Sequence, residues 1–208
     1  MRHCDSRPDS CVPFVDPIER VKYRFEQNAQ LSLRAAASQA APIAAAAEAI
    51  VGSLMGGGKV LSCGNGCSAA DADYFTAQMQ NRFDRQRPGL PAISLCGDAT
   101  LLTAIAADEG FEHVFAKQVN ALGHPGDILL TLCAGGSAPN IRFAIRQARE
   151  RQMKVVSLAG GGDHDAPGDN DCDIEIATPS DDVTRILENH RSVVHCLCDL
   201  IDLQLMGG

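Results

Sequence analysis

The chain has 208 residues, a formal net charge of −8 at pH 7 and a hydrophobic content of 45%, with only 4% aromatic residues. Its length fits one domain, because a single hydrophobic core stops growing at about 250 residues. The negative charge disfavours direct nucleic-acid binding through a broad basic face. Neither a signal peptide nor an apolar run long enough to cross a membrane is found, which predicts a cytoplasmic protein without a membrane partner.

Nine cysteines are scattered through apolar segments of the sequence. An odd number of this kind is typical of reduced thiols that pack as small core residues. The spacings Cys63/Cys67 and Cys196/Cys198 do not match the paired CxxC pattern of a structural zinc site. We therefore predict no metal and no resident cofactor from these residues.

The N-terminal part divides into an arm and the start of a helical region. Residues 1–16 show no periodicity and are predicted to form a flexible N-terminal arm, which leaves a single domain over 17–208. Asp16 and Pro17 are typical of a helix start, and apolar residues at helical spacing extend the helix to about Ala37. Its length favours packing on another subunit as well as on its own domain.

A second N-terminal helix is predicted from Pro42, because proline is favoured in the first turn of a helix. This helix covers residues 43–54 and ends at the glycines at 56–58.

The remaining chain alternates between short apolar runs and segments of helical spacing. Strands are predicted over 60–63, 92–95, 128–133, 154–158 and 172–177, and helices over 71–83, 100–106, 111–122, 140–151 and 184–205. Strands that alternate with helices favour a parallel α/β sheet with right-handed crossovers.

The stretch Lys59–Ala72, KVLSCGNGCSAADA, is the centre of this pattern and reads as a strand, a glycine turn and a helix N-terminus. Unpaired backbone N–H groups and the positive end of the helix dipole would suit an anion or a sugar phosphate there. The alternative is that the glycines only form a sharp turn. A second glycine turn follows Cys133, and since ligands bind beyond the carboxyl ends of parallel strands, both turns are predicted to face one crevice.

Several segments together resemble a known family: CGNGCSAADADYF, RPGLPAI, LTAIAADEGFEHVFAKQVNALGHPGDILL, MKVVSLAG and HCLCDLID. They are similar to the sugar isomerase (SIS) domain, in the branch that holds phosphoheptose isomerase and the bacterial DnaA initiator-associating protein, and closer to the latter. The resemblance covers about residues 18–205. It implies a three-layer, flavodoxin-like or Rossmann-like α/β sandwich with a five-stranded parallel sheet flanked by helices. It also implies a homotetramer with sites at subunit interfaces.

The resemblance places the isomerase's chemical groups on four positions of this chain. The His and second Glu of the HFAEEL-type helix fall on Tyr74 and Gln78, the Gln of the last helix falls on Leu187, and its second His is retained as His195. Gln78 has no titratable group and Leu187 can hold neither a metal nor a hydroxyl. His195 without these partners is more often a satisfied core histidine than a catalyst.

The phosphate loop STSGNS of the family becomes Cys-Ala-Gly-Gly-Ser-Ala over 133–138, so the hydroxyl groups expected at 133, 134, 135 and 138 are all missing. Backbone amides remain, so Gly136 and Ser137 are candidates for weak sugar-phosphate binding. The first turn keeps Asn65, Gly66 and Ser68 for the same role.

Two sites have thus lost side chains while the sheet and helix patterns are intact. We expect a non-catalytic adaptor that binds the replication initiator DnaA and promotes its assembly at the origin. One alternative is a sedoheptulose 7-phosphate isomerase, in which zinc would be a cofactor and His195 and Ser68 would act. Another is a sugar-phosphate-sensing binding protein. The predicted partners are other copies of the chain, DnaA and a phosphosugar.

Overall fold

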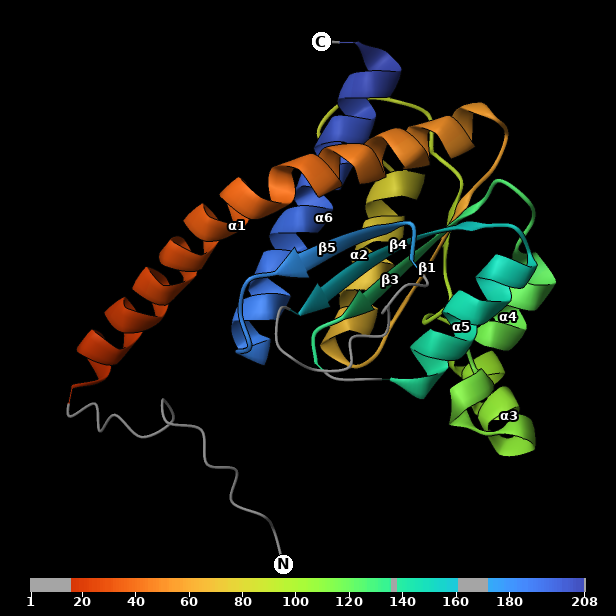
Figure 1. Ribbon diagram of the computed structural model, residues 1–208, viewed down its shortest axis with the longest axis horizontal. Coiled ribbons are helices and arrows are strands. Elements are labelled where there is room, and N and C mark those ends of the chain that lie inside the picture. Colours follow the sequence, from red (N-terminus) through yellow and green to blue (C-terminus); the bar gives the residue numbers. More distant parts are fainter. Residues whose placement is uncertain (1–15, 136–137, 161–171, 208) are drawn as a thin grey trace, which may run out of the picture.

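A computed structural model describes residues 16–135, 138–160 and 172–207 of the chain (Figure 1). Its centre is a five-stranded parallel sheet with strand order β2-β1-β3-β4-β5. The strands are β1 Val60–Gly64, β2 Ala92–Ser94, β3 Ile128–Cys133, β4 Lys154–Gly160 and β5 Ile174–Thr178. The predicted arm falls almost entirely on residues 1–15, which lie outside the described residues.

Helices cover both faces of this sheet (Figure 1). They are α1 Pro17–Met55, α2 Cys67–Gln80, α3 Ala99–Glu109, the 3-10 helix η1 Phe111–His113, α4 Ala116–Leu122, α5 Pro139–Glu150 and α6 Val183–Met206. One hydrophobic core lies between the sheet and α1, α2 and α6, and a second lies between the sheet and α3, α4 and α5. The predicted three-layer α/β fold is confirmed.

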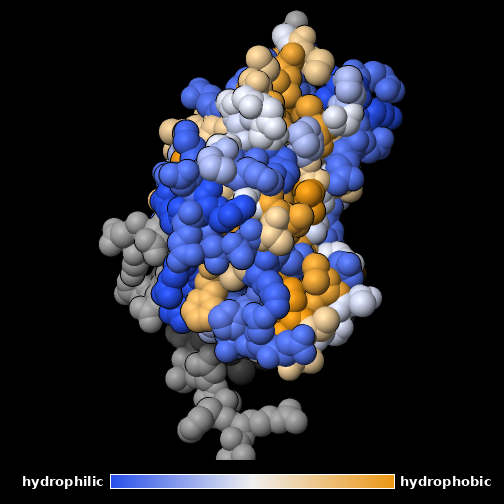
Figure 2. All heavy atoms as spheres, turned by 90° about the vertical axis from the view of Figure 1, so that its right-hand side faces the viewer, coloured by the Kyte–Doolittle hydropathy of each residue, from blue (hydrophilic) through white to orange (hydrophobic). Residues whose placement is uncertain are grey.

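The central strands explain why the sheet sits between two cores. Every residue of β1 and β3 is buried, which is typical of parallel strands with helices on both sides. Alternate residues of β3 point to opposite faces: Leu130 and Leu132 contact the α1, α2 and α6 layer, while Leu129 contacts the α3, α4 and α5 layer. The outer surface of that second layer is mainly hydrophilic, with apolar side chains gathered in places (Figure 2).

The prediction of two N-terminal helices is wrong, because α1 is one helix of 39 residues with Pro42 inside it. A proline here removes one backbone hydrogen bond at a cost of roughly 3 kcal/mol. Burial outweighs this cost, since one face of the helix is buried on both sides of the proline, at Ala35 and at Ile43 and Ile50. The buried Gln39 also donates hydrogen bonds to the Ala177 carbonyl and the Asn189 side chain.

The single helix predicted over 111–122 is also wrong, because the structure has η1 followed by α4. Gly110 enters this segment with a φ of 98°, a conformation that favours glycine. Val114 and Phe115, between the two helices, are both buried in the second core. Packing both side chains inward explains the break in the regular helix.

The first half of α1 extends beyond the body of the molecule (Figure 1). It carries exposed apolar side chains at Ile18, Val21, Phe25 and Leu33. Such a face is typical of helices that pack against another chain. None of the helices in the described ranges combines the length and apolarity needed to span a membrane.

Candidate functional site

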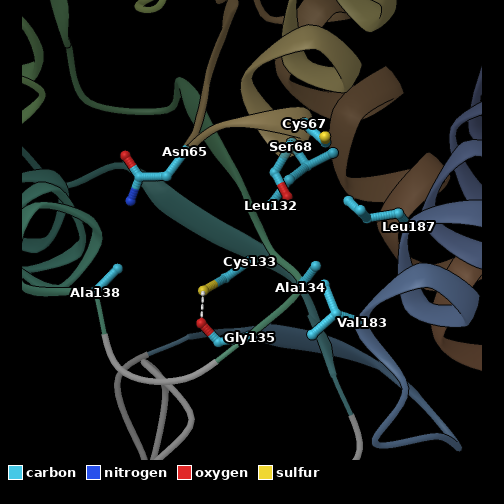
Figure 3. A pocket seen from close by; sticks show the side chains of 10 residues that line it. All are labelled: Asn65, Cys67, Ser68, Leu132, Cys133, Ala134, Gly135, Ala138, Val183 and Leu187. Carbon is cyan, nitrogen blue, oxygen red and sulfur yellow. Dashed lines mark hydrogen bonds between the residues drawn. The ribbon is translucent and has the colours of Figure 1, made fainter. Parts of the chain in front are cut away.

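The direction of the strand order reverses between β1 and β3, and ligands of open α/β sheets bind at such a switch point. A cavity of about 360 Å³ lies there (Figure 3). Its walls come from the turns after β1 and β3 and from the start of α6, and its lining residues are Asn65, Cys67, Ser68, Leu132, Cys133, Ala134, Gly135, Ala138, Val183 and Leu187. The prediction that both glycine turns face one crevice is confirmed.

The turn from β1 into α2 depends on two glycines. A Cβ on Gly64 would lie 2.6 Å from the carbonyl oxygen of Ser68, so only glycine lets the strand approach the first turn of α2. Gly66 has a φ of 57° and caps α2 without lining the cavity. Ser68 is buried, and its hydroxyl points into the cavity (Figure 3). Within the described part of the chain, this hydroxyl has no hydrogen-bond partner, so it is available to a ligand.

Asn65 is held by a reciprocal amide pair with Asn140 at the start of α5. The Asn65 Nδ2 donates to the Asn140 Oδ1 at 2.9 Å, and the Asn140 Nδ2 donates back to the Asn65 Oδ1 at 2.8 Å. The same Asn140 oxygen accepts from the backbone N–H of Ile141. Asn140 therefore fixes the predicted ligand residue Asn65. Sequence reasoning missed Asn140, which is the second residue of α5 and not its N-cap, so it lacks the usual capping signal.

The turn after β3 gives the cavity an apolar wall. Cys133, Ala134 and Ala138 line it, and the Cys133 thiol donates to the Gly135 carbonyl (Figure 3). Burial raises the pKa of the Cys133 thiol, so it stays neutral near pH 7. The predicted residues Gly136 and Ser137 lie outside the described residues.

A further wall comes from Val183 and Leu187 near the start of α6, and Val183 lies beside the turn after β3 (Figure 3). Leu187 is one of the four positions that the resemblance assigned to chemistry, and the structure places it in the cavity. Gln78 is half-buried on α2 and does not line the cavity, while its backbone carbonyl accepts from Arg87. The four positions therefore do not form one cluster.

A polar cluster lies where α2 and α6 pack together. The Tyr74 hydroxyl and the His195 Nε2 are 3.1 Å apart. The Arg191 guanidinium lies 3.9 Å from the centre of the Tyr74 ring and forms a 2.5 Å ion pair with Asp71. We call Asp71, Tyr74, Arg191 and His195 the seam cluster.

The seam cluster continues two walls of the cavity. Asp71 follows Cys67 by four residues on α2, and Arg191 follows Leu187 by four residues on α6, so each lies one turn beyond a lining residue. Burial raises the pKa of Asp71, and Arg191 opposes this shift. Sequence reasoning missed Asp71 and Arg191. Their one sequence signal is this four-residue spacing.

Comparison with known proteins identifies the family. The SIS domain model matches residues 24–160. The chain belongs to the SIS domain family. A phosphoheptose isomerase from Aromatoleum aromaticum is 49% identical over 93% of this chain and 98% of its own length, and one from Azoarcus is 47% identical over 93% and 98%. Solved phosphoheptose isomerases from Francisella tularensis and Neisseria gonorrhoeae match this SIS domain with TM-scores of 0.85 and 0.83. Their identities are 42% and 39%, over 90% and 89% of this chain and 98% of each of theirs.

These relatives overturn the expectation of a non-catalytic DnaA adaptor, and the closer likeness to the DnaA-associating protein is not supported. The expectation treated each missing side chain of the family pattern as a lost function. The SIS domain of this chain keeps the cavity, the helix N-terminus at Gly66 and a polar cluster beside it. The relatives and the site together favour the isomerase alternative.

The isomerase alternative included zinc, and the described side chains at the four positions that the resemblance assigned to chemistry do not fit that metal. Among Tyr74, Gln78, Leu187 and His195, only the histidine is a common zinc ligand. The Tyr74 hydroxyl already pairs with the His195 Nε2. Among the described residues, no group of three or more His, Cys, Asp or Glu side chains is arranged to hold a metal ion.

Proposed function

We propose that this chain is a phosphosugar isomerase of the phosphoheptose type, with sedoheptulose 7-phosphate as its substrate. The observation that carries the proposal is the high identity, over nearly the full length, to several proteins named phosphoheptose isomerase. A cavity at the switch point of the sheet, between two glycine turns, is the second support.

The phosphate group would bind at the start of α2. The Ser68 and Ala69 N–H groups already donate to the Asn65 and Gly66 carbonyls, so the attraction for an anion there would come mainly from the positive end of the helix dipole. Ser68 adds a hydroxyl that points into the cavity. Asn65, fixed by Asn140, adds a polar group to the same side. These groups compensate in part for the hydroxyls that the turn after β3 lacks.

Isomerisation moves one proton between adjacent carbons of the sugar. A base removes the proton from the hydroxyl-bearing carbon, the proton returns to the former carbonyl carbon, and the hydroxyl proton moves to the other oxygen, so no atom is gained or lost. His195 is the member of the seam cluster whose neutral ring carries a nitrogen lone pair that can accept the proton. Tyr74, which pairs with its Nε2, would hold the imidazole in place.

The homotetramer and the cytoplasmic location stay predictions. The exposed apolar face of α1 supports self-association, because Ile18, Val21 and Phe25 would be covered by a second copy of the chain. The single domain over 17–208 is part of the same proposal, and the two cores share one sheet.

The test is an isomerase assay of the purified full chain with sedoheptulose 7-phosphate. We expect turnover by the wild type and a loss of about 100-fold or more in His195→Gln, the range for removing a general base. His113→Gln is the matched control, because His113 also lies beside an aromatic ring, 5.0 Å from Phe143, but away from the cavity. Binding of the sugar phosphate without turnover would favour the sensor alternative. The absence of both binding and turnover would refute the proposal.

A further inference from the structure

The seam cluster contains a positive charge that the family pattern does not assign. We propose, on the basis of the proposed function, that the Arg191 guanidinium binds the oxygen at the carbonyl end of the sugar and supplies there the fixed positive charge that a metal ion would otherwise supply. The site then binds its sugar phosphate without zinc.

The position of Arg191 fits this role. It lies on α6 one turn, or about 6 Å, beyond the cavity residue Leu187, and His195 lies one further turn away. With the phosphate at the start of α2, the carbon chain of the sugar would run along the boundary between α2 and α6. Its carbonyl end would then reach the seam cluster, where the proposed base His195 lies.

The contacts of Arg191 hold the guanidinium but leave donors for a ligand. One nitrogen pairs with the Asp71 carboxylate at 2.5 Å, and one face lies over the Tyr74 ring at 3.9 Å. A guanidinium has five N–H donors in a planar fork, so several remain. The Arg191 side chain is 37% exposed, whereas that of Asp71 is 7% exposed. The carboxylate therefore anchors the guanidinium from below, and the open edge faces away from the core.

The same contacts explain why the position suits an arginine. During isomerisation, negative charge develops on the oxygen of the former carbonyl group, and preorganised donors stabilise it without further rearrangement. The ion pair and the aromatic ring fix the guanidinium before the sugar binds. Among the described residues, the donor set around Tyr74 and His195 does not fit zinc, and Arg191 supplies a positive charge at this end.

The first experiment measures metal content and sugar binding on the same purified wild-type protein. We expect far less than stoichiometric zinc by elemental analysis. We also expect the affinity for sedoheptulose 7-phosphate, measured by calorimetry, to be the same before and after treatment with a chelator. Stoichiometric zinc, together with binding that is lost on chelation and restored by zinc, would overturn the inference.

The second experiment uses Arg191→Met, which keeps most of the side-chain volume and removes the charge. The affinity for sedoheptulose 7-phosphate should fall by about 10- to 100-fold, the usual range for one hydrogen bond to a charged group. The affinity for inorganic phosphate should not change, since phosphate alone binds at the start of α2. Arg191→Lys should restore part of the sugar affinity. An equal loss for both ligands would indicate a merely structural role and refute the inference.

Two further variants test whether the loss of sugar affinity in Arg191→Met is specific to the charge at this position. Arg146→Met is the matched control, because Arg146 also lies over an aromatic ring, 5.6 Å from the centre of Phe143, and does not line the cavity. The double variant Asp71→Asn/Arg191→Met avoids a stranded buried carboxylate. It should melt like the wild type and bind the sugar as weakly as Arg191→Met. Wild-type affinity in the double variant would overturn the inference.

The outcomes separate this inference from the proposed function. A wild type that shows no turnover, but binds the sugar phosphate through Arg191, would refute the isomerase and leave the inference standing. Turnover that depends on bound zinc would support the isomerase function and refute the inference about Arg191.

Discussion

Protonation of His190 should destabilise the fold as the pH falls below neutral. His190 lies on α6 and is fully buried. Its Nε2 lies 3.3 Å from the backbone carbonyl oxygen of Ala159 on β4, which fits a neutral ring with its proton on Nε2. The other ring nitrogen, Nδ1, is buried and has no hydrogen-bond partner in the described structure. A second proton would therefore create a charge and an unpaired donor inside the core.

The size of the effect follows from the shift in pKa. Burial lowers the pKa of His190 from 6.5 to about 4, against the opposing effect of the Ala159 carbonyl. Below its ordinary pKa the unfolded chain binds a proton that the folded chain does not, so the free energy of unfolding falls with the pH. The contribution is fully present above pH 6.5 and is lost by the time the pH reaches about 4. A shift of this size corresponds to roughly 3 kcal/mol.

The assay is urea unfolding of the wild type and of His190→Gln at several values between about pH 7 and pH 4. Glutamine keeps a donor for Ala159 but cannot be protonated, so the carboxylates that titrate in both proteins cancel in the difference. The wild type should lose roughly 3 kcal/mol more than the variant over this range. Parallel curves for the two proteins would show that His190 titrates normally in the folded state and would refute the reasoning.

Three other changes test the packing and the site. Arg87→Met should lower the free energy of unfolding in urea by about 3–5 kcal/mol, because it leaves Asp202 without its almost wholly buried 2.5 Å ion pair. The double variant Arg87→Met/Asp202→Asn should recover part of this free energy. A loss below about 1 kcal/mol in the single variant would contradict the argument. Ser68→Ala should weaken phosphosugar binding in calorimetry by about 10-fold with little change in melting temperature, because its hydroxyl points into the cavity without a described protein partner. Equal affinities would exclude the serine from the site. Phe25→Asp should lower the oligomeric state measured by light scattering, because Phe25 is 75% exposed on the projecting part of α1. An unchanged mass would place the subunit contact elsewhere.

The sheet could be predicted from sequence because its strands carry strong local signals. The segment Ile128–Cys133 is apolar except for Thr131 and lies between two turns, and its predicted bounds match β3. The main error in the helices came from Pro42, where a good local signal for a helix start was overridden by burial on both sides. Such an override depends on what α1 packs against, and sequence periodicity does not contain that information.

The candidate site also contains residues that could be predicted from local sequence and residues that only tertiary packing brings together. Asn65 and Ser68 could be predicted because they follow a strand and a glycine turn within a few residues. Tyr74 and His195 are 121 residues apart, and only the packing of α2 on α6 brings them together. The resemblance named both positions but gave no reason to connect them through Arg191. Their contact belongs to the tertiary structure.

The two ends of the cavity depend on different parts of the chain, which explains why missing side chains were a poor guide to function. At the start of α2, the proposed anion site relies on the helix dipole and on Ser68, and the side-chain substitutions over 133–138 leave both in place. At the seam cluster, side chains carry the chemistry, and Tyr74 and His195 there pair with each other next to Arg191. The loss of hydroxyl groups over 133–138 therefore says little about the chemistry at the seam cluster. On the proposed function, turnover would depend on the seam cluster, because there the backbone offers no substitute for a missing side chain.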